Sequence, residues 1–362
     1  MADQFLASAP LFPLSKYVRE LRPDLGPEVY QPATSRVALI PIHLTVIAGL
    51  TLVIAKAWVP WPIVPVLAIV IGISFACLTF VAHEALHGGI VRGKLARHVV
   101  GWIGFLPFVV SPRLWVAWHD RVHHANANMP DDPDMYPSLD VYHANRQVRA
   151  FVNWFSLGGR RWRGVLSLVL GFTVQSAHQL IRSTTVGFLT RDKRRLAIVE
   201  TLLGVVVWGT VAALVGFVPF LFVYVMPLVI ANMIIMSFIL TNHGLNPRVS
   251  VNDPLVSGLS VTTPRWIETL TLGFGFHVEH HLFPAMSTRH APAVRALVLK
   301  RWPERYQSMS IVAAVRALHR TGRIYKDAVT LVDPRSGAEF PVLMPRMVEP
   351  VAIPAVCTAV GT

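Results

Sequence analysis

The stretch TLLGVVVWGTVAALVGFVPFLFVYVMPLVIANMIIMSFILTN, residues 201–242, contains no Asp, Glu, Lys, Arg or His. A membrane-crossing helix needs about 20 mostly apolar residues, so this stretch is long enough for two crossings. We place them at about 199–216 and 219–241, on either side of the sequence GFVP, and we place two further crossings at about 37–55 and 62–82. Only 15% of the 362 residues are charged, against about 25% in soluble domains. The sequence therefore predicts an all-α integral membrane protein with four transmembrane helices.

The distribution of basic residues predicts which ends of these helices face the cytoplasm. Of the 33 Lys and Arg residues, only Lys56 lies in or between the paired crossings, and the turns at 58–61 and 216–219 contain none. Cytoplasmic loops are enriched in Lys and Arg, so we expect both turns to face away from the cytoplasm and both ends of the chain to face it. The net charge of +13 would then lie against anionic lipid, and we expect a multi-pass protein of a bacterial inner membrane.

Composition also limits the other classes of protein. The basic residues are spread over many loops without a nucleic-acid-binding motif, so we expect no nucleic-acid partner. The first 35 residues lack the apolar core of a secretory signal peptide, and the two cysteines, Cys77 and Cys357, cannot form a disulfide framework. We expect three regions: a cytoplasmic segment at 1–36, a membrane domain at 37–301 and a cytoplasmic segment at 302–362.

Nine of the 15 histidines lie in four places, all predicted at the cytoplasmic end of a crossing or in the adjoining cap. Three of the places are the motifs HEALH (83–87), HDRVHH (119–124) and HVEHH (277–281), and the fourth is a single histidine after residue 242. Residues three or four apart share one face of a helix, and adjacent residues are rotated by about 100°. A motif that ends in two histidines can therefore contact two metal ions. The nine candidate ligands are His83, His87, His119, His123, His124, His243, His277, His280 and His281.

The number of histidines indicates the kind of site. One HxxxH pair alone is more often structural, but three groups with helical spacing on one membrane face are typical of a metal centre. A zinc site takes about four ligands, so nine histidines suit two ions, and imidazole ligands suit iron, copper, zinc or nickel. Carboxylates that orient the imidazoles are expected nearby: Glu84, Asp120 and Glu279 lie inside the motifs, and Asp131, Asp132 and Asp134 follow the second. This pattern favours a redox-active di-metal centre held by a cytoplasmic helical cap.

The remaining histidines are not expected to bind metal. We expect His43 and His178 to be structural, although His178, close to Gln175, can line the site. The others are expected at the surface: His98, His143, His290 and His319.

The motifs HEALH, HDRVHH and HVEHH, the last followed by LFP, resemble those of the membrane fatty acid desaturase family over about residues 37–301. The resemblance implies four crossings, a cap with a non-haem di-iron centre (Fe2+/Fe3+) and the histidines of the three motifs as ligands. It also implies O2-dependent attack on an unactivated C–H bond of a fatty acid, acyl thioester or acyl lipid. Electrons would come from a separate ferredoxin, rubredoxin or cytochrome. Some members carry an Asn four residues before an additional histidine; here Ile239 stands at that position before His243, and Asn242 is adjacent to it.

Several alternatives stay open at this point. Within the family, desaturation is the first choice, and decarboxylation of free fatty acids to terminal alkenes and acyl hydroxylation are alternatives. HEALH also matches the HExxH motif of zinc metalloproteases, but residues 201–242 offer no carboxylate as a further ligand. A metal transporter would need polar residues along its crossings, which are nearly free of them.

The sequence also supports predictions for segments outside the histidine motifs. All histidine motifs must share one side of the membrane, so we expect residues 165–181 and 98–110 to lie in the interface or the cap. Aromatic residues can line an acyl tunnel or anchor the interface: Trp115, Trp118, Phe276 and Phe283. The basic clusters 160–163 and 191–195 can hold a headgroup or an electron donor, or simply be cytoplasmic charge. Residues 328–342 predict a hairpin with its turn at 333–337, and the apolar tail 351–362 is too short to cross the membrane.

Overall fold

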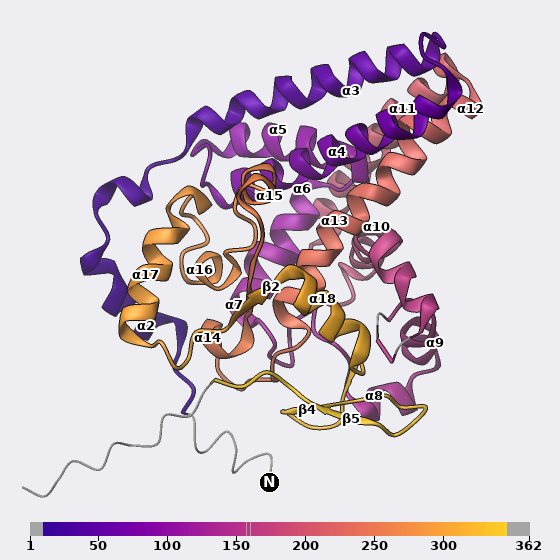
Figure 1. Ribbon diagram of the computed structural model, residues 1–362. Helices are drawn as coiled ribbons and strands as arrows, with labels where there is room; N and C mark the ends of the chain where they lie inside the picture. Colours follow the sequence, from indigo (N-terminus) through magenta and orange to yellow (C-terminus); the bar gives the residue numbers. More distant parts are fainter. Residues whose placement is uncertain (1–9, 157, 160, 346–362) are drawn as a thin grey trace, which may run out of the picture.

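The computed structural model describes residues 10–156, 158–159 and 161–345, and most of these are helical (Figure 1). Five of the described helices are long and apolar enough to cross a membrane: Pro27–Ala55, Trp61–His87, Trp162–Arg182, Arg191–Val215 and Phe217–His243. The predicted helical fold, with several membrane-compatible helices and a histidine cluster, is confirmed. The count of four crossings stays a prediction, because the helix at Trp162–Arg182 meets the same criteria of length and composition.

The four helices expected to cross the membrane form two hairpins. The first consists of α3 (Leu39–Ala55), the short η4 (Trp61–Ile63) and α4 (Val64–His87). The second consists of α11 (Arg191–Val215), α12 (Phe217–Phe220), the π-helical η8 (Leu221–Val225) and α13 (Met226–His243). The N-terminal segment contains α2 (Leu14–Leu21) and the short helices η1 (Arg22–Asp24), η2 (Pro27–Tyr30) and η3 (Thr34–Ala38).

The turns of the two hairpins lie together, at the end of the molecule opposite the histidines. The rings of Trp61 and Phe222 are 4.9 Å apart between centroids, which places η4 beside the start of η8. His87 is the last residue of α4 and His243 is the last residue of α13. The helix ends that carry histidines therefore share one end of the molecule, as the charge distribution requires.

Close backbone contact holds α4 in the middle of the helices. It packs against α3, α5 (Lys94–Phe105) and α13. A Cβ atom at Gly72 would lie 2.7 Å from Cβ of Ile230 on α13, and one at Gly104 would lie 2.4 Å from the carbonyl oxygen of Leu78. Real Cβ atoms do not approach other atoms so closely. Glycine is therefore needed at both helix–helix contacts for the helices to pack at these distances. Gly88 caps the C-terminal end of α4, and its φ of +96° suits glycine.

A sharply bent segment follows α4. Its first arm is α5 with η5 (Leu106–Phe108), and its second arm comprises α6 (Pro112–Trp115), the π-helical η6 (Val116–His123) and α7 (His124–Asn126). The arms meet at an angle of 101°, the geometry of a broken span or a re-entrant loop. The segment expected in the interface, residues 98–110, makes up most of the first arm.

Three further helices connect this segment to α11: α8 (Leu139–Ala144), α9 (Arg146–Phe155) and, after the short η7 (Trp162–Gly164), α10 (Val165–Arg182). Helix α10 packs along α13, and the backbone N–H groups of Phe172 and Thr173 donate to Asn232 Oδ1 at 3.1 and 3.3 Å. The expectation that residues 165–181 stay on the histidine side of the membrane is not tested by their length and composition.

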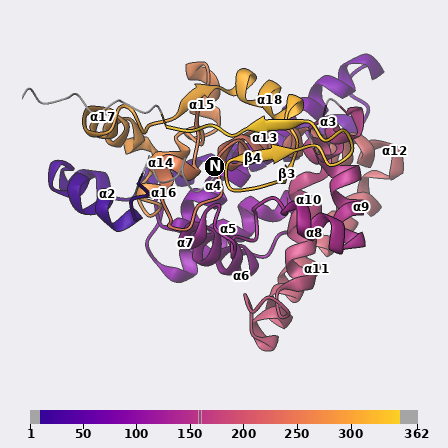
Figure 2. The same cartoon turned by 90° about the horizontal axis from the view of Figure 1, so that it is seen from below.

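The C-terminal part of the chain folds over the histidine end. It contains α14 (Pro254–Ser257), β1 (Ser260–Thr262), α15 (Arg265–Leu270), α16 (His277–Leu282), η9 (Thr288–His290), α17 (Ala291–Arg301), β2 (Ser308–Ser310), α18 (Ile311–Arg320), β3 (Ile324–Tyr325), β4 (Thr330–Val332) and β5 (Glu339–Pro341). Strands β1 and β2 pair in parallel, and β3, β4 and β5 form an antiparallel sheet. Seen from below, β3, β4 and α18 lie across the end of α13 (Figure 2).

The hairpin predicted near the C-terminus is confirmed. Leu331 pairs with Phe340, and in the turn the N–H of Gly337 donates to the carbonyl of Asp333 at 2.8 Å. The sequence did not predict the third strand, β3, or the β1–β2 pair. The apolar tail 351–362 lies outside the described residues.

Candidate metal centre

The nine candidate histidines converge from four helical segments that are far apart in the sequence. The ends of α4 and α13, the π-helical turn η6 with α7, and α16 each contribute one to three of them. Seven are buried: His83, His87, His123, His124, His277, His280 and His281. The other two, His119 and His243, are partly buried. A cluster of imidazoles this well shielded from water needs partners for its ring nitrogens.

The first group of ring nitrogens comes from His83, His87, His119 and His280, whose candidate ligand atoms all lie within 4.8 Å of one another. The Nε2 atoms of His83 and His119 are 3.2 Å apart. His124 adjoins this group, because its Nε2 lies 3.2 Å from Nε2 of His280. The group thus combines α4, η6 with α7, and α16.

The second group comes from His123, His243 and His281, again with ligand atoms within 4.8 Å of one another. His277 adjoins it, because its Nε2 lies 2.6 Å from Nε2 of His243, which in turn lies 3.2 Å from Nε2 of His281. Adjacent histidines therefore divide between the groups: His280 belongs to the first and His281 to the second. This division is what the rotation of about 100° between neighbouring helical residues produces.

Three of these four Nε2–Nε2 distances fit nitrogen atoms that share a metal ion, whereas the 2.6 Å between His277 and His243 is shorter. Two imidazole nitrogens about 2.1 Å from one ion, at a tetrahedral angle, are about 3.4 Å apart. The three Nε2–Nε2 distances of 3.2 Å are close to this value. Without an ion, each pair would need one protonated nitrogen as a donor, and a cluster of nine rings offers few other acceptors.

Hydrogen bonds on the far side of three rings leave Nε2 free to bind a metal. His243 Nδ1 lies 2.8 Å from the carbonyl oxygen of Ser257, which can only accept, so Nδ1 carries the proton. His87 Nδ1 lies 2.9 Å from Asp120, and His123 Nδ1 lies 2.9 Å from Asp132. Nε2 of His87 is buried and has no hydrogen-bond partner among the described residues. Such Nδ1 partners are typical of metal-binding histidines.

Burial also keeps the histidines of α16 neutral. It lowers the pKa of His277, His280 and His281 well below 6.5, and the neighbouring imidazoles lower it further. A neutral imidazole has the lone pair that a metal ion requires. The donor set therefore fits two metal ions with imidazole ligands.

The carboxylates after the second motif support the same rings. Asp132 accepts from His123 Nδ1 and from the backbone N–H of Asn128. Asp134 accepts from Trp118 Nε1 at 3.0 Å and from Gln175 Nε2 at 2.6 Å, and it lies 3.7 Å from His123 Nδ1. Burial raises the pKa of Asp134 to about 6, and the neighbouring Asp132 adds to the rise. Both carboxylates lie on the Nδ1 side of the ring, so they orient His123 from outside the group of Nε2 atoms.

The two glutamates inside the motifs have partners other than the expected histidines. Glu84 accepts from Arg36, from Ser287 Oγ and from the N–H of Thr288. Its carboxylate therefore ties the end of α4 to the N-terminal segment and to the loop after α16.

Glu279 is completely buried and has a similar role in α16. It accepts from Ser260 Oγ at 2.7 Å, Arg295 Nε at 2.7 Å and Tyr306 Oη at 2.6 Å. These bonds connect α16 to β1, α17 and the loop before β2. The charges inside the first and last motifs thus hold the helices that present the histidines.

The comparison with known proteins agrees with this geometry. The family model described as fatty acid desaturase matches residues 56–313, well over half of the chain. The chain belongs to the fatty acid desaturase family. It is 24% identical over 267 residues to a chloroplastic omega-6 fatty acid desaturase of Brassica napus, covering 69% of this chain and 56% of the relative.

Two other relatives extend this likeness within the desaturase family. The corresponding Spinacia oleracea protein is 22% identical over 317 residues, covering 83% of this chain and 66% of the relative. An sn-1 oleoyl-lipid 12-desaturase of a Picosynechococcus strain is 21% identical over 323 residues, covering 79% of this chain and 83% of the relative. The chain spans a little over half the length of the Brassica napus protein.

Aromatic side chains form one wall of this desaturase-family centre. The ring of Trp115 lies 5.1 Å from His83 and 4.5 Å from His119, and Phe274 lies 4.9 Å from His83. Trp118 donates to Asp134, whereas Phe276 packs under Arg295 and Phe283 against Tyr30. Of the four aromatic residues expected beside an acyl chain, Trp115 contacts the histidines directly. Phe274, Gln175 and Ser257 were not predicted as part of the site.

The other histidines lie outside the two groups. His178 is exposed, and it is Gln175 on the same helix that reaches the site through Asp134. Of the four histidines expected at the surface, His143 is exposed, whereas His98, His290 and His319 are partly buried. His98 also lies 2.9 Å from Glu200. Asn242 is buried, and its Oδ1 has no hydrogen-bond partner among the described residues.

The basic clusters have structural partners. Arg194 donates to the carbonyl of Leu180, and Arg195 lies 3.6 Å from Asp192. Arg163 lies 4.6 Å from the ring centroid of Trp154, and Arg160 lies outside the described residues.

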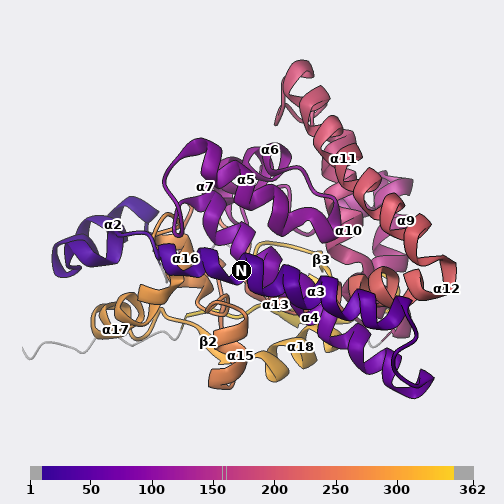
Figure 3. The same ribbon diagram turned by 90° about the horizontal axis from the view of Figure 1, so that it is seen from above.

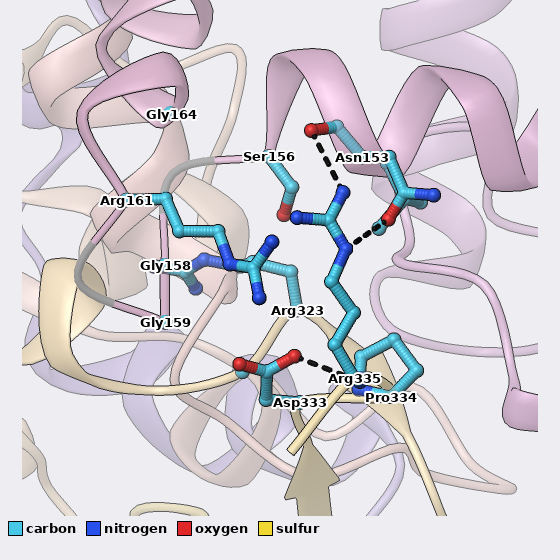
Figure 4. Close-up of a pocket in the computed structure, with 12 residues that line it drawn as sticks. Asn153, Ser156, Gly158, Gly159, Arg161, Gly164, Arg323, Asp333, Pro334 and Arg335 are labelled. Atoms are coloured by element: carbon cyan, nitrogen blue, oxygen red, sulfur yellow. Dashed lines mark hydrogen bonds between the residues drawn. The ribbon is translucent and has the colours of Figure 1, made fainter. Parts of the chain in front are cut away.

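A small cavity of about 30 Å³ lies between the loop after α9 and the C-terminal hairpin (Figure 4). It is lined by charged side chains that include Arg161, Arg323, Asp333 and Arg335. Arg335 Nε donates to Asn153 Oδ1 at 2.9 Å, which attaches the hairpin to α9. Arg323 donates to the carbonyl of Gly244 at 3.0 Å, directly after the ligand candidate at the end of α13. Hydrogen bonds from the C-terminal segment thus reach both α9 and the end of α13 that carries His243.

Proposed function

We propose that this desaturase-family chain is a membrane-bound di-iron oxidoreductase that converts a single C–C bond of a fatty acyl chain into a double bond. The observation that carries the proposal is the presence of two groups of imidazoles. Within each group the candidate ligand atoms lie within 4.8 Å of one another, and Trp115 packs beside the first group. The ligands would be the nine histidines named above. Balanced over one turnover, an acyl –CH2–CH2– unit, O2, two electrons and two protons give –CH=CH– and two water molecules.

The protein supplies position and an apolar environment. Bound iron, with O2 and electrons, would supply the oxidant that removes hydrogen from the chain. Asp120, Asp132 and the carbonyl of Ser257 fix three imidazole rings so that Nε2 points inward. Trp115 and Phe274 border His83 with apolar ring surface, which suits an alkyl chain and excludes water.

The proposal includes an acyl lipid or acyl thioester as substrate and a separate electron donor of ferredoxin, rubredoxin or cytochrome type. The relatives' names refer to fatty acid and oleoyl-lipid desaturases, which supports an acyl substrate. We also propose that the histidine end faces the cytoplasm, with crossings near 37–55, 62–82, 199–216 and 219–241 inside a catalytic domain at 37–301. The location of nearly all Lys and Arg residues outside these crossings supports this orientation.

The surroundings of HEALH differ from those of a zinc protease, in which the motif takes one further protein ligand and leaves a position open for water. His83 and His87 share their group with His119 and His280. In addition, Glu84, which would be the general base of a protease, is engaged by Arg36, Ser287 and Thr288. This arrangement supports the oxidoreductase over the protease.

The test is to purify the protein, measure bound metal, reduce it and supply O2 with fatty acids and acyl lipids of several chain lengths. We expect about two irons per chain and an internal double bond, identified by mass spectrometry. His280→Ala should lose iron and turnover, whereas His143→Ala, an exposed histidine outside the cluster, should keep both. A single zinc ion would refute the di-iron proposal, and a hydroxylated product or a terminal alkene would refute desaturation.

A further inference from the structure

A large apolar groove lies among the helices at the end away from the histidines. It has a volume of about 550 Å³ and is bordered by α3, α4, α11 and the bend after α5. Its walls include Leu44 and Ala48 of α3, Phe75 of α4, Pro107 of η5 and Trp208 of α11. Figure 3 shows that α3 and α11 diverge away from the hairpin turns. The groove has the size and apolar character of a ligand-binding pocket.

The groove is long enough to hold much of an acyl chain. On α3 its lining extends from Leu44 to Lys56, and at a rise of 1.5 Å per residue this is about 18 Å. One leaflet of a bilayer has about 15 Å of hydrocarbon, half of the usual 30 Å. On α11 the lining continues to Val215, the last residue of that helix. The groove therefore reaches the end of the molecule where the two hairpin turns meet.

The side chain of Lys56 places one positive charge where the groove reaches the two hairpin turns. Lys56 lines the groove, is exposed, and is the only Lys or Arg in or between the paired crossings. Nearby, Trp58 and Trp61 are 66% and 59% exposed. Exposed tryptophans at a helix end are typical of the headgroup layer, so they place the ammonium group of Lys56 at the depth of lipid phosphates.

We propose that this groove binds one acyl chain of an anionic phospholipid whose phosphate pairs with Lys56, on the membrane side opposite the histidines. The walls exclude water because they offer it few hydrogen-bond partners. A zwitterionic lipid can place the same chain in the groove, but its positively charged group opposes Lys56, whereas an anionic headgroup carries no such charge.

The lipid site is distinct from the proposed reaction site. None of the nine candidate histidines lines the groove. Phe105, adjacent in the chain to the groove-lining Leu106, packs against Trp115 with ring centroids 5.6 Å apart, and Trp115 lies 5.1 Å from His83. The bound lipid would fill the space between α3 and α11 and hold the two hairpins together. The proposal does not depend on which reaction the metal centre performs.

The test measures binding of palmitoyl-oleoyl phosphatidylglycerol and of the matching phosphatidylcholine to the full chain in mild detergent, by native mass spectrometry. We expect one tightly bound phosphatidylglycerol and weaker phosphatidylcholine. Lys56→Gln should weaken phosphatidylglycerol about fivefold, since one basic residue at the membrane surface contributes about 1 kcal/mol. Lys94→Gln, an exposed lysine at the histidine end, should change nothing. Equal affinities for the two lipids, or equal effects of both lysine variants, would overturn the assignment to Lys56.

A second pair of variants tests the groove itself. Ala48→Trp places a large ring in the groove and should abolish binding of both lipids, whereas Ile42→Trp, on an exposed part of the same helix outside the lining, should keep both. If Ala48→Trp does not elute as a monodisperse protein, Ala48→Leu replaces it, with a partial loss expected. Retention of phosphatidylglycerol by a well-folded groove-filling variant would overturn the proposal.

Discussion

We expect the buried ion pair between Glu279 and Arg295 to contribute strongly to the stability of the helix that carries the last histidine motif. Glu279 is fully buried and accepts from Ser260, Arg295 and Tyr306, so Glu279→Gln removes the negative charge and places an amide among donors. Removing one partner of a buried pair costs about 3–5 kcal/mol. The side chain of Arg295 is 22% exposed and can recover some hydration. We therefore expect a loss near the lower end of this range, about 3 kcal/mol.

The assay is chemical unfolding in detergent together with measurement of iron content. Glu279→Gln should unfold at lower denaturant and lose iron, because α16 carries three candidate ligands. Glu28→Gln, at an exposed glutamate, is the matched control. A double-mutant cycle with Arg295→Met should give a coupling on the order of 2 kcal/mol. A loss below about 0.5 kcal/mol, within the usual range of a surface substitution, or purely additive variants, would refute the role assigned to this pair.

Three other perturbations have definite expected outcomes. Asp132→Asn should weaken metal retention by about 10–100-fold, because His123 loses the carboxylate that orients its ring, and metal titration of the stripped protein measures this. Acid should destabilise the metal-free protein: the pKa values of the three histidines of α16 are lowered in the fold, so the unfolded chain binds more protons below about 6.5. Its free energy of unfolding should therefore fall as pH decreases from 7.5 to 5.5, and a constant value would contradict the assigned burial. Gly72→Ala should cost about 1–3 kcal/mol because its Cβ meets Ile230, whereas Gly49→Ala, with open space around it, should cost nothing; equal thermal midpoints would disprove the close helix contact.

The parts of the site that follow local spacing could be predicted from the sequence. Histidines three or four residues apart share a helix face, and adjacent ones do not, regardless of the rest of the fold. The spacing of HVEHH therefore predicted that this motif can contact two metal ions, and the division of His280 and His281 between the two groups agrees with that prediction. Asp120 and Asp132 were also identified as supporting carboxylates, because each is close in sequence to a histidine motif. Their hydrogen bonds to His87 and His123 agree with that interpretation.

Contacts between distant segments could not be predicted in this way. Glu84 has its partners more than 200 residues away at Ser287 and Thr288, and the helical pattern around it gives no sign of them. The carbonyl of Ser257 is a backbone group and has no sequence signature. The sequence also did not predict the π-helical form of η6, because π-helical segments are rare and this eight-residue stretch has no distinct pattern of apolar residues. Such features depend on tertiary packing, which one sequence does not reveal.

The wide spread of the ligands along the chain has a consequence for biosynthesis. Translation produces His83 and His87 first, while His243 and the three histidines of α16 leave the ribosome much later. Neither group of imidazoles is complete until α16 has been made and has folded back against the end of α4. We therefore expect metal loading of the proposed centre to be a late event, which follows synthesis of the C-terminal half of the chain. A chain truncated before residue 277 would insert its helices and still have no closed pocket to retain the metal.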